Sequence, residues 1–405
     1  MIVRHKRVVL GDIANISSGG TPSRSNPAYW NGNIPWVKTT QIQNCIINKT
    51  DVDEWITDEG LKKSSAKMIS AGTILMAMYG QGKTRGQVSI LNFDASINQA
   101  CAAIDLKNGI CRDFVYQSLL ASYTRIRNMS NTGGQENLSA GLIKEIPITL
   151  PSLPEQQAIA DLLSTWDEAI EKTERLIRAK ERRLDAYARD LFDRKNDGKH
   201  EGWKVVKLKT VLTEHGDKST GTEEVYSVSV HKGLVNQIEH LGRSFSAANT
   251  DNYNRVHYGD IVYTKSPTGD FPLGIVKQSY AKEDVIVSPL YGVFTPRIFN
   301  LGIVLDFYFS SPARARNYLF PIVQKGAKNT IAITNKTFLS KALHLPIDEK
   351  AQKAVAEFVY AAREEIDLLK QLADKYKTQK RGLMQKMLTG EWLVKPEIVN
   401  QYMEA

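Results

Sequence analysis

Two segments decide the fold, 150-LPSLPEQQAIADLLSTWDEAIEKTERLI-177 and 345-LPIDEKAQKAVAEFVYAAREEIDLLKQLA-373. Each opens with Leu-Pro and runs into a stretch in which apolar residues recur at two positions of a seven-residue repeat. A shift of 196 residues brings the two repeats into the same register. A sustained heptad repeat is typical of a coiled-coil seam. The two segments therefore predict two long helices that pair, each of about 35 residues or 50 Å.

The predicted seam residues occupy the repeat positions that would face the partner helix. They are Leu163, Trp166, Ile170, Ile177, Leu184 and Tyr187 in the first helix and Val359, Ile366, Leu369, Tyr376 and Leu383 in the second. Lys180 and Lys380 fall on the same seam, where we expect their stems to lie along it with the charge in solvent. Asp348 can cap the second helix, and Gly198 and Gly390 stand where the helices are expected to stop.

The stretches that precede the two helices also correspond to each other. Residues 72–90 align with 259–278, and each predicts a strand, a glycine-containing loop and a second strand. Residues 113–122 align with 306–315, and a helix is expected in each. The chain is therefore a globular α/β block followed by a long helix, repeated once.

This repeat divides the chain into consecutive parts. We predict a first globular domain, a central helix, a second globular domain, a C-terminal helix and a tail at residues 1–150, 151–197, 198–346, 347–390 and 391–405. In the tail, WLVKPEIV (392–399) resembles the start of a further block, so the tail is expected to return toward residue 8.

The surplus of positive charge lies in two separate places. The net charge is +9, and residues 1–150 and 196–345 each carry +5, whereas 151–195 carry −1 and 346–405 are neutral. A polyanionic partner that contacts two places is the simplest interpretation. A soluble protein that is merely somewhat basic remains the alternative.

Composition excludes several classes of protein. Three cysteines without a CxxC pair argue against a disulfide framework or a zinc site. The chain has no apolar run of about 20 residues, so no membrane span is expected. The basic first ten residues lack the apolar core of a signal peptide. A reducing, cytoplasmic setting fits best.

The strongest catalytic candidate is 77-AMYGQGKT-84, which satisfies a relaxed P-loop pattern. A P-loop requires a helix directly after it, because the helix amides hold the phosphates. Here the chain continues as RGQVSI (85–90), which alternates like a strand. Seven histidines show no HxH or HExxH spacing, and no carboxylate cluster marks a nuclease. We therefore predict no catalytic residue and no metal site on this chain.

Polar stretches with aromatic neighbours recur at corresponding points of the two basic blocks. Such side chains contact phosphates and base edges, although turns use the same residue types. The residues predicted to bind DNA are Lys38, Thr39, Thr40, Gln41, Tyr79, Gln81, Lys83, Thr84, Arg85, Asn98, Gln99, Gln135, Ser229, His231, Lys232, Tyr263, Lys265, Ser266, Thr268, Lys325, Lys328 and Asn329.

These features together resemble the specificity subunit of type I restriction–modification enzymes over nearly the whole chain. The segments that carry the resemblance are LGDIANISSGGTPSRSNPAYWNGNIPWV (10–37), AMYGQGKTRGQ (77–87), LPEQQAIADLL (153–163) and KRGLMQKMLTGEW (380–392). The resemblance implies an α+β fold with two target-recognition domains in a pseudo-twofold repeat, separated by two long helices that form an antiparallel coiled coil.

The resemblance also implies the function. Each domain would read one half of a bipartite, asymmetric site in double-stranded DNA. The helices would dock modification methyltransferase subunits that use S-adenosylmethionine. A restriction and translocase subunit that uses ATP and Mg²⁺ would join them, and this chain would hold no cofactor. Two alternatives stay open: a coiled-coil adaptor that binds only proteins, and a self-sufficient ATPase or nuclease.

Overall fold

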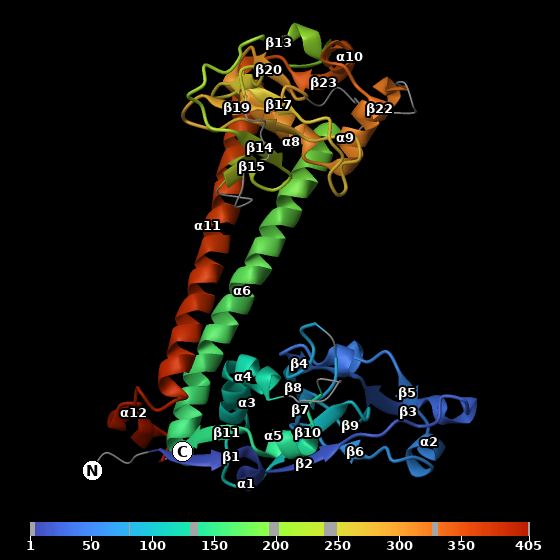
Figure 1. Cartoon of the computed structure of the whole chain (residues 1–405), viewed down its shortest axis with the longest axis vertical. Helices are drawn as coiled ribbons and strands as arrows, with labels where there is room; N and C mark the ends of the chain where they lie inside the picture. The colour runs from blue at the N-terminus through green and yellow to red at the C-terminus, as the bar shows by residue number, and fades with distance from the viewer. Residues whose placement is uncertain are drawn as a thin grey trace. The chain divides into compact units, whose positions relative to one another are not determined.

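Two helices are much longer than the other elements of the fold. In the computed structural model, which describes residues 5–80, 82–129, 137–193, 202–238, 249–325 and 331–403, these are α6 (Leu153–Phe192) and α11 (Glu349–Met387) (Figure 1). The chain forms two compact units: unit 1 comprises residues 1–174 and 371–405, and unit 2 comprises residues 175–370. Each unit thus contains one end of each long helix. The boundary crosses both helices, so the five-part division of the sequence stays a prediction.

The two helices pair in an antiparallel sense in each unit. In unit 1 the start of α6 lies beside the end of α11, and the Trp166 and Tyr376 rings meet edge to face with centroids 5.6 Å apart. In unit 2 the end of α6 lies beside the start of α11, and the rings of Tyr187 and Phe358 are 4.1 Å apart. Every predicted seam residue is buried or half-buried. The predicted antiparallel coiled coil is confirmed.

One of the two seam lysines differs from the prediction. Lys380 is only 9% exposed, and its Nζ lies 2.6 and 2.7 Å from the two carboxylate oxygens of Asp167 on the other helix. Lys180 Nζ lies 2.6 Å from the Glu365 carboxylate. The expectation that the charge reaches solvent was therefore wrong for Lys380, whereas Lys180 and Glu365 are 29% and 48% exposed and keep access to water. A charged group that is removed from water needs an opposite charge, and the partner helix supplies it.

The repeat extends to individual contacts. Glu174 pairs with Lys377 at 2.7 Å in unit 1, and Glu181 pairs with Lys370 at 2.7 Å in unit 2. The shift of 196 residues turns one pair into the other, with the two helices exchanged. The same contact is thus repeated in each unit, as an internal duplication predicts.

The helix starts repeat in the same way. Gln156 and Gln352 are buried, and each donates from Nε2 to the carbonyl of the proline before its helix, at 3.0 Å. Asp348 accepts from the Ala351 N–H at 3.0 Å, which confirms it as the cap of α11. Gly390 follows the end of α11 with φ +76°, as predicted, and Gly198 lies outside the described residues.

Unit 1 contains the elements before α6 and the short helix after α11. Its strands are β1 (Lys6–Val9), β2 (Ala14–Ser18), β3 (Trp30–Val37), β4 (Ile46–Ile47), β5 (Trp55–Ile56), β6 (Met68–Ile69), β7 (Ile74–Ala77), β8 (Val88–Leu91), β9 (Ala95–Ile97), β10 (Cys101–Leu106) and β11 (Pro147–Leu150). Its short helices are α1 (Leu10–Ile13), η1 (Pro27–Tyr29), η2 (Thr39–Gln41), η3 (Lys49–Asp51), α2 (Asp58–Lys62), α3 (Arg112–Ala121), α4 (Tyr123–Asn128), α5 (Ala140–Lys144) and α12 (Pro396–Gln401).

Unit 2 contains the elements between the long helices. Its strands are β12 (Trp203–Lys207), β13 (Leu212–Glu214), β14 (Tyr226–Ser229), β15 (Gly233–Asn236), β16 (Asn254–Val256), β17 (Ile261–Tyr263), β18 (Val276–Gln278), β19 (Val285–Val287), β20 (Gly292–Pro296), β21 (Gln324–Lys325), β22 (Ile331–Ala332) and β23 (Ala342–Pro346). Its short helices are η4 (Leu208–Thr210), α8 (Phe299–Phe309), α9 (Pro312–Leu319), η5 (Phe320–Ile322) and α10 (Asn335–Ser340).

The main sheets of the two units have the same strand order. In unit 1 the order is β2-β10-β7-β8, with β4 added at the edge, and in unit 2 it is β13-β20-β17-β18. A small two-stranded sheet accompanies each, β1-β11 and β12-β23. The helix that follows β10 or β20 in the chain, α3 or α8, buries Phe114 or Val304 in the core of its unit. The predicted strand–loop–strand segments are confirmed as β7–β8 and β17–β18.

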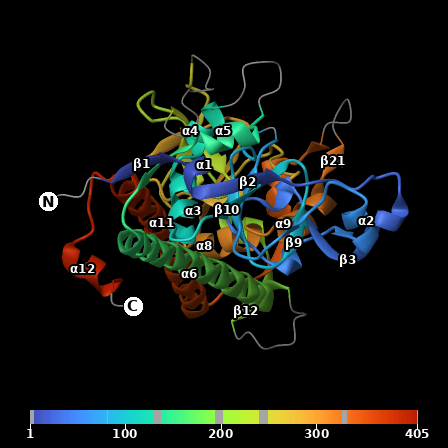
Figure 2. The same ribbon diagram turned by 90° about the horizontal axis from the view of Figure 1, so that it is seen from below.

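Two predictions about helices and the tail need correction. Residues 306–315 do not form one helix, because α8 ends at Phe309 and α9 begins at Pro312, where Ser311 caps the new helix. The tail forms α12 rather than a first strand. It does return to unit 1, where α12 lies near the start of α6 (Figure 2). The Tyr402 hydroxyl there donates to Asp161 on α6 at 2.8 Å. Among the described residues, no helix has the length and apolar character needed to cross a bilayer.

Candidate nucleic-acid interface

The loop between β7 and β8 is the most exposed of the predicted DNA-binding segments in unit 1. A backbone pair closes it, with Ala77 N–H donating to Gln87 O and Gly86 N–H donating to Ala77 O, both at 2.9 Å. Tyr79 and Lys83 are exposed on it. The chain then enters β8 at Val88 instead of a helix. The helix that a P-loop needs is therefore replaced by a strand, as predicted.

Side chains of helix α4 and of the loop itself make hydrogen bonds that support this loop. The Tyr123 hydroxyl donates to Lys83 O at 2.5 Å, and Arg127 donates to that hydroxyl at 2.9 Å. Arg85 is 5% exposed, and its Nη2 lies 3.5 Å from Arg127 O. Arg85 therefore supports the loop, and its position does not favour the predicted DNA contact. Thr84 is half-buried beside it.

The equivalent loop of unit 2 connects β17 to β18. Thr264 N–H donates to Ile275 O at 2.9 Å, the same closure as in unit 1. Ser266 and Thr268 are exposed. Lys265 is half-buried, and burial lowers its pKa although Glu214 opposes the effect. A lysine that is partly removed from water gains from an anionic partner such as a phosphate.

Tyr263 does not reach the surface of this loop. Its side chain is fully buried, and its hydroxyl donates to Leu273 O at 2.8 Å. A tyrosine in the core has no face to offer to a base, so the predicted contact has no support from its position. Gly274 closes the loop with φ +99°, and a Cβ there would lie 1.8 Å from Thr264 O, so only glycine fits.

The predicted residues after β3 are held by carboxylates of their own domain. Lys38 Nζ lies 2.9 Å from Asp53 and 2.6 Å from Glu54, and hydrogen bonding to Glu54 raises the pKa of Lys38. Gln41 donates to Asp53 at 2.8 Å. Their charges and donors are already engaged. Thr39 is half-buried and Thr40 is exposed next to them.

The remaining predicted residues fall into three groups. Asn98 accepts from the Ala100 N–H in its own turn, whereas Gln99 is exposed. Ser229, half-buried, accepts from Lys232 N–H at 3.3 Å in the β14–β15 turn, where His231 and Lys232 are exposed. The side chains of Gln81, Gln135, Lys325, Lys328 and Asn329 lie outside the described part of the structure.

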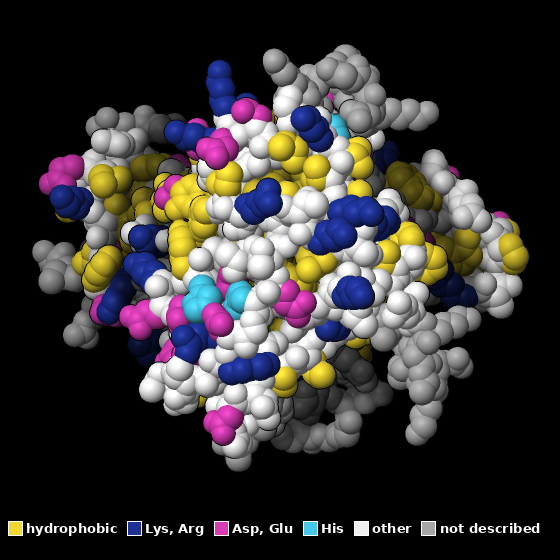
Figure 3. Space-filling model, turned by 90° about the horizontal axis from the view of Figure 1, so that it is seen from above, with side chains coloured by type: hydrophobic (Ala, Val, Ile, Leu, Met, Phe, Trp, Pro, Cys, Tyr) yellow, Lys and Arg dark blue, Asp and Glu magenta, His cyan; other side chains and the backbone are white. Residues whose placement is uncertain are grey.

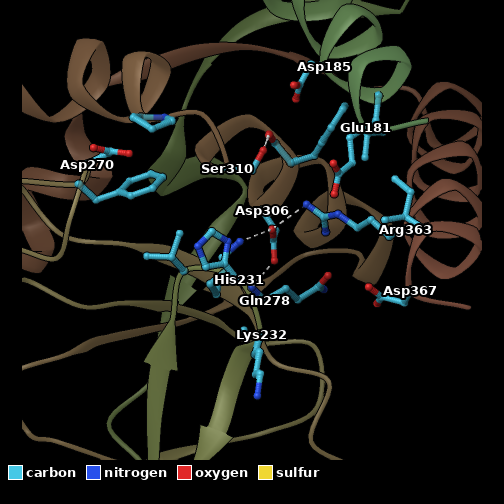
Figure 4. Close-up of a pocket in the computed structure, with 18 of the residues that line it drawn as sticks. Glu181, Asp185, His231, Lys232, Asp270, Gln278, Asp306, Ser310, Arg363 and Asp367 are labelled. Atoms are coloured by element: carbon cyan, nitrogen blue, oxygen red, sulfur yellow. Dashed lines mark hydrogen bonds and ion pairs between the residues drawn. The ribbon is translucent and has the colours of Figure 1, made fainter. Parts of the chain in front are cut away.

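A cavity of about 620 Å³ lies in unit 2 between the β14–β15 turn and the long helices (Figure 4). His231 and Lys232 line one side, but carboxylates line much of the rest: Glu181, Asp185, Asp270, Asp306 and Asp367. Two of its cations, Lys277 and Arg363, are paired with Asp306, and Lys370 is paired with Glu181. The cavity therefore offers little attraction to a phosphate.

The buried carboxylate of Asp306 forms a cluster of polar contacts at the wall of this cavity. Its carboxylate accepts from Gln278 N–H and from Arg363, both at 3.0 Å, and lies 3.5 Å from Lys277 Nζ (Figure 4). Burial by itself raises the pKa of Asp306, but Lys277 and Arg363 outweigh burial and hold this pKa below its usual range. The cluster joins α8 and β18 to α11.

Unit 1 has a polar contact in the corresponding place. The 196-residue shift takes Asp167 to Arg363. Asp167 accepts from Gln117 on α3 at 2.8 Å and from Lys380 on α11. In both units a polar contact thus ties the globular domain to the helix pair.

Comparison with known proteins points to one family. Residues 4–180 match the family described as the type I restriction modification DNA specificity domain. Over these residues and beyond, the chain is similar to the type I restriction–modification specificity subunits. Specificity subunits are the non-catalytic components of type I systems that recognise the DNA target.

Individual relatives give the same similarity. The chain is 25% identical over 272 residues to the MjaIX specificity subunit of Methanocaldococcus jannaschii, which covers 62% of this chain and 61% of that one. It is 23% identical to the MjaVIII specificity subunit of the same organism, over 96% of this chain and 93% of that one. The chain thus matches about three fifths of the length of the first relative and most of the second.

The fold is shared with a solved specificity subunit. The crystal structure of the type I S subunit from M. genitalium superposes with a TM-score of 0.59 at 15% identity, over 95% of this chain and 96% of that one. At this identity the likeness concerns the fold alone. It supports the arrangement of two long helices packed together between β-rich domains.

The chain also contains a cluster that the sequence did not predict. His215, Asp217 and His257 bring three possible metal-ligand atoms within 4.8 Å of one another. The prediction of no metal site rested on ligands close together in sequence. His257 follows Asp217 by 40 residues and lies in a different loop, so spacing gave no signal.

Proposed function

We propose that this specificity subunit reads a bipartite, asymmetric site in double-stranded DNA, with one half-site read by each globular domain. The observation that carries the proposal is the pair of equivalent loops, β7–β8 and β17–β18. They leave the same place in two sheets of the same strand order, but they carry different side chains. One framework with two different loops favours two different half-sites.

The exposed side chains of the two loops suit this role. The first presents Tyr79 and Lys83, and the second presents the exposed Ser266 and Thr268 beside the half-buried Lys265. Lysines neutralise phosphates, whereas tyrosine, serine and threonine also reach base edges. The net charge of +5 on each globular block supports binding to a polyanion at two places.

The partners follow from the family and from the surface of the helices. Leu162, Leu176, Leu368 and Leu372 are 37–58% exposed on α6 and α11, outside the seam. We propose that this surface docks modification methyltransferase subunits, which bind S-adenosylmethionine. A restriction and translocase subunit that uses ATP and Mg²⁺ completes the assembly in the cytoplasm, and these partner subunits rather than this chain hold the cofactors of the reactions.

Site selection tests the proposal. The chain is assembled with its methyltransferase subunits, and bound sites are selected from a randomised DNA library. Lys83→Ala should relax or weaken one half-site only, and Lys265→Ala the other. Each loss should also lower the slope of log K against log salt by about 0.9 if the lysine contacts one phosphate.

Lys204→Ala is the matched control, because Lys204 is an exposed lysine on β12, away from both loops. It should leave both half-sites unchanged. If Lys83→Ala and Lys265→Ala relax the same half-site, the assignment of one reader to each domain is wrong.

A further inference from the structure

Two loops of unit 2 lie side by side where the sequence gives no reason to expect it. One follows β13 and contains His215 and Asp217, and the other follows β16 and contains His257. Backbone hydrogen bonds join them, with Arg255 N–H donating to Asp217 O at 2.9 Å and Ser219 N–H donating to Tyr253 O at 3.1 Å. The two imidazole rings are consequently 5.2 Å apart. Figure 3 shows histidine side chains, in cyan, lying against acidic ones, in magenta.

One nitrogen of each ring faces the same carboxylate oxygen. His257 Nε2 is 2.9 Å and His215 Nδ1 is 3.7 Å from Asp217 Oδ2. Ligands of a tetrahedral zinc ion bind at 2.0–2.2 Å, which separates neighbouring ligand atoms by about 3.4 Å. The two distances to Asp217 lie on either side of this value, all three atoms are within 4.8 Å of one another, and rotation of the exposed Asp217 can adjust their spacing.

The other nitrogen of each ring is held by a second carboxylate. His215 Nε2 lies 2.9 Å from Asp260 Oδ2, and His257 Nδ1 lies 2.8 Å from Asp284 Oδ1. The side chain of Asp260 is only 1% exposed. It accepts two further hydrogen bonds, from the backbone N–H of His257 and from the Thr295 hydroxyl. Metal-binding histidines usually donate their second N–H to a carboxylate in this way, which fixes the tautomer and turns the lone pair toward the ion.

One of the inward atoms lacks a protein partner. His215 Nδ1 is buried and makes no hydrogen bond within the described parts of the chain. With Nε2–H donating to Asp260, Nδ1 carries a lone pair that has no donor to accept from. A buried acceptor without a partner is costly, and a bound cation would satisfy it.

We propose that His215, Asp217 and His257 bind a divalent transition-metal ion, of which zinc is the best match. Two imidazoles and one carboxylate favour zinc and its neighbours over magnesium and calcium, which prefer all-oxygen sites. Three protein ligands leave a fourth position for water, on the side where Asp217 is exposed. The ion would link the loop after β13 to the loop after β16. This site is independent of the proposed DNA reading.

The test is a calorimetric titration of the metal-free full-length chain with zinc. The absorption spectrum of the chain with Co²⁺ is a second readout. One equivalent should bind, and Co²⁺ should give the visible bands of a four-coordinate ion with nitrogen and oxygen ligands. His257→Gln and Asp217→Asn should each weaken binding by roughly 100-fold or more, since loss of an outer-shell partner alone costs 10–100-fold. Both variants keep a polar side chain of similar size, and melting without metal checks their folding.

Two controls locate the site. His344→Gln alters a histidine of β23 outside the cluster, and Cys45→Ser removes the exposed thiol. Both should bind zinc as the wild type does. If folded His257→Gln binds zinc as tightly as the wild type, or if the wild type binds none, the cluster is only a network of ion pairs in which His257 is an imidazolium between Asp217 and Asp284.

Discussion

At the scale of single residues, the buried carboxylate of Asp306 is the most consequential charge in unit 2. It is 2% exposed and compensates both Lys277 and Arg363. Asp306→Asn removes the negative charge and leaves two cations facing each other. Breaking a buried ion pair on one side costs on the order of 3 kcal/mol, because the remaining charge has lost its compensation. Urea unfolding should show this loss in the transition of unit 2.

The pH dependence of this loss has a definite sign. The pKa of Asp306 is lower in the folded chain than in the unfolded one. Its contribution is therefore complete above the usual carboxyl range near 4 and disappears as the pH falls through the folded pKa. The difference in stability between the wild type and Asp306→Asn should be constant from about pH 7 to 5 and shrink below about pH 4.

Asp270→Asn is the control for this prediction. Asp270 lines the same cavity but is exposed, so its removal should change stability by less than about 0.5 kcal/mol. An equal effect of the two substitutions would mean that the ion pairs of Asp306 do not stabilise the junction.

At the scale of elements, the ion pair between Lys380 and Asp167 places a charged group inside the seam of the helix pair. Its ammonium is held between the two oxygens of Asp167 and is almost fully buried. Lys380→Glu would place two carboxylates together where water has little access. We expect a loss of about 2 kcal/mol in unit 1, less than for a fully buried pair because Asp167 is half exposed.

Lys375→Glu makes the same change of charge on the exposed face of the same helix. It should leave the melting temperature nearly unchanged. If both variants melt alike, net charge rather than the seam contact determines the result.

At the scale of the whole molecule, the long helices are expected to set the spacing between the two half-sites. Insertion of seven residues after Leu176 and after Leu372 preserves the heptad phase of both helices. It lengthens each by about 10 Å, which corresponds to about three base pairs at 3.4 Å each. The preferred spacer should grow by about three base pairs, with some loss of affinity because the second half-site also rotates around the duplex.

Site selection from a library of variable spacer length measures this shift. Insertion of four residues at the same places is the comparison, since it breaks the seam register and should destabilise the pair. A folded seven-residue variant that still prefers the original spacer would show that another feature sets the distance.

The sequence by itself determined the elements from which this protein is built. Heptad positions such as Leu163 and Val359 were identifiable because side chains seven residues apart face the same neighbour, whatever the rest of the chain does. The duplicated strand–loop–strand segments could be predicted for the same reason, because alternating apolar residues and glycine turns are local signals. The prediction of one helix at 306–315 was wrong because it rested on the match of this segment to 113–122. Within the segment, Ser311 caps a new helix that begins at Pro312.

Only the tertiary structure decided which polar side chains are available. Arg85, Tyr263 and Lys38 have the residue types of a DNA-binding surface, yet one supports a loop, one lies in the core and one is held by carboxylates. Residue type does not reveal burial or partners, because these depend on segments far apart in sequence. The same reason hid the pairing of Lys380 with Asp167 and the convergence of His215 with His257. Local periodicity fixes elements, whereas charge compensation and ligand geometry arise only when distant elements pack together.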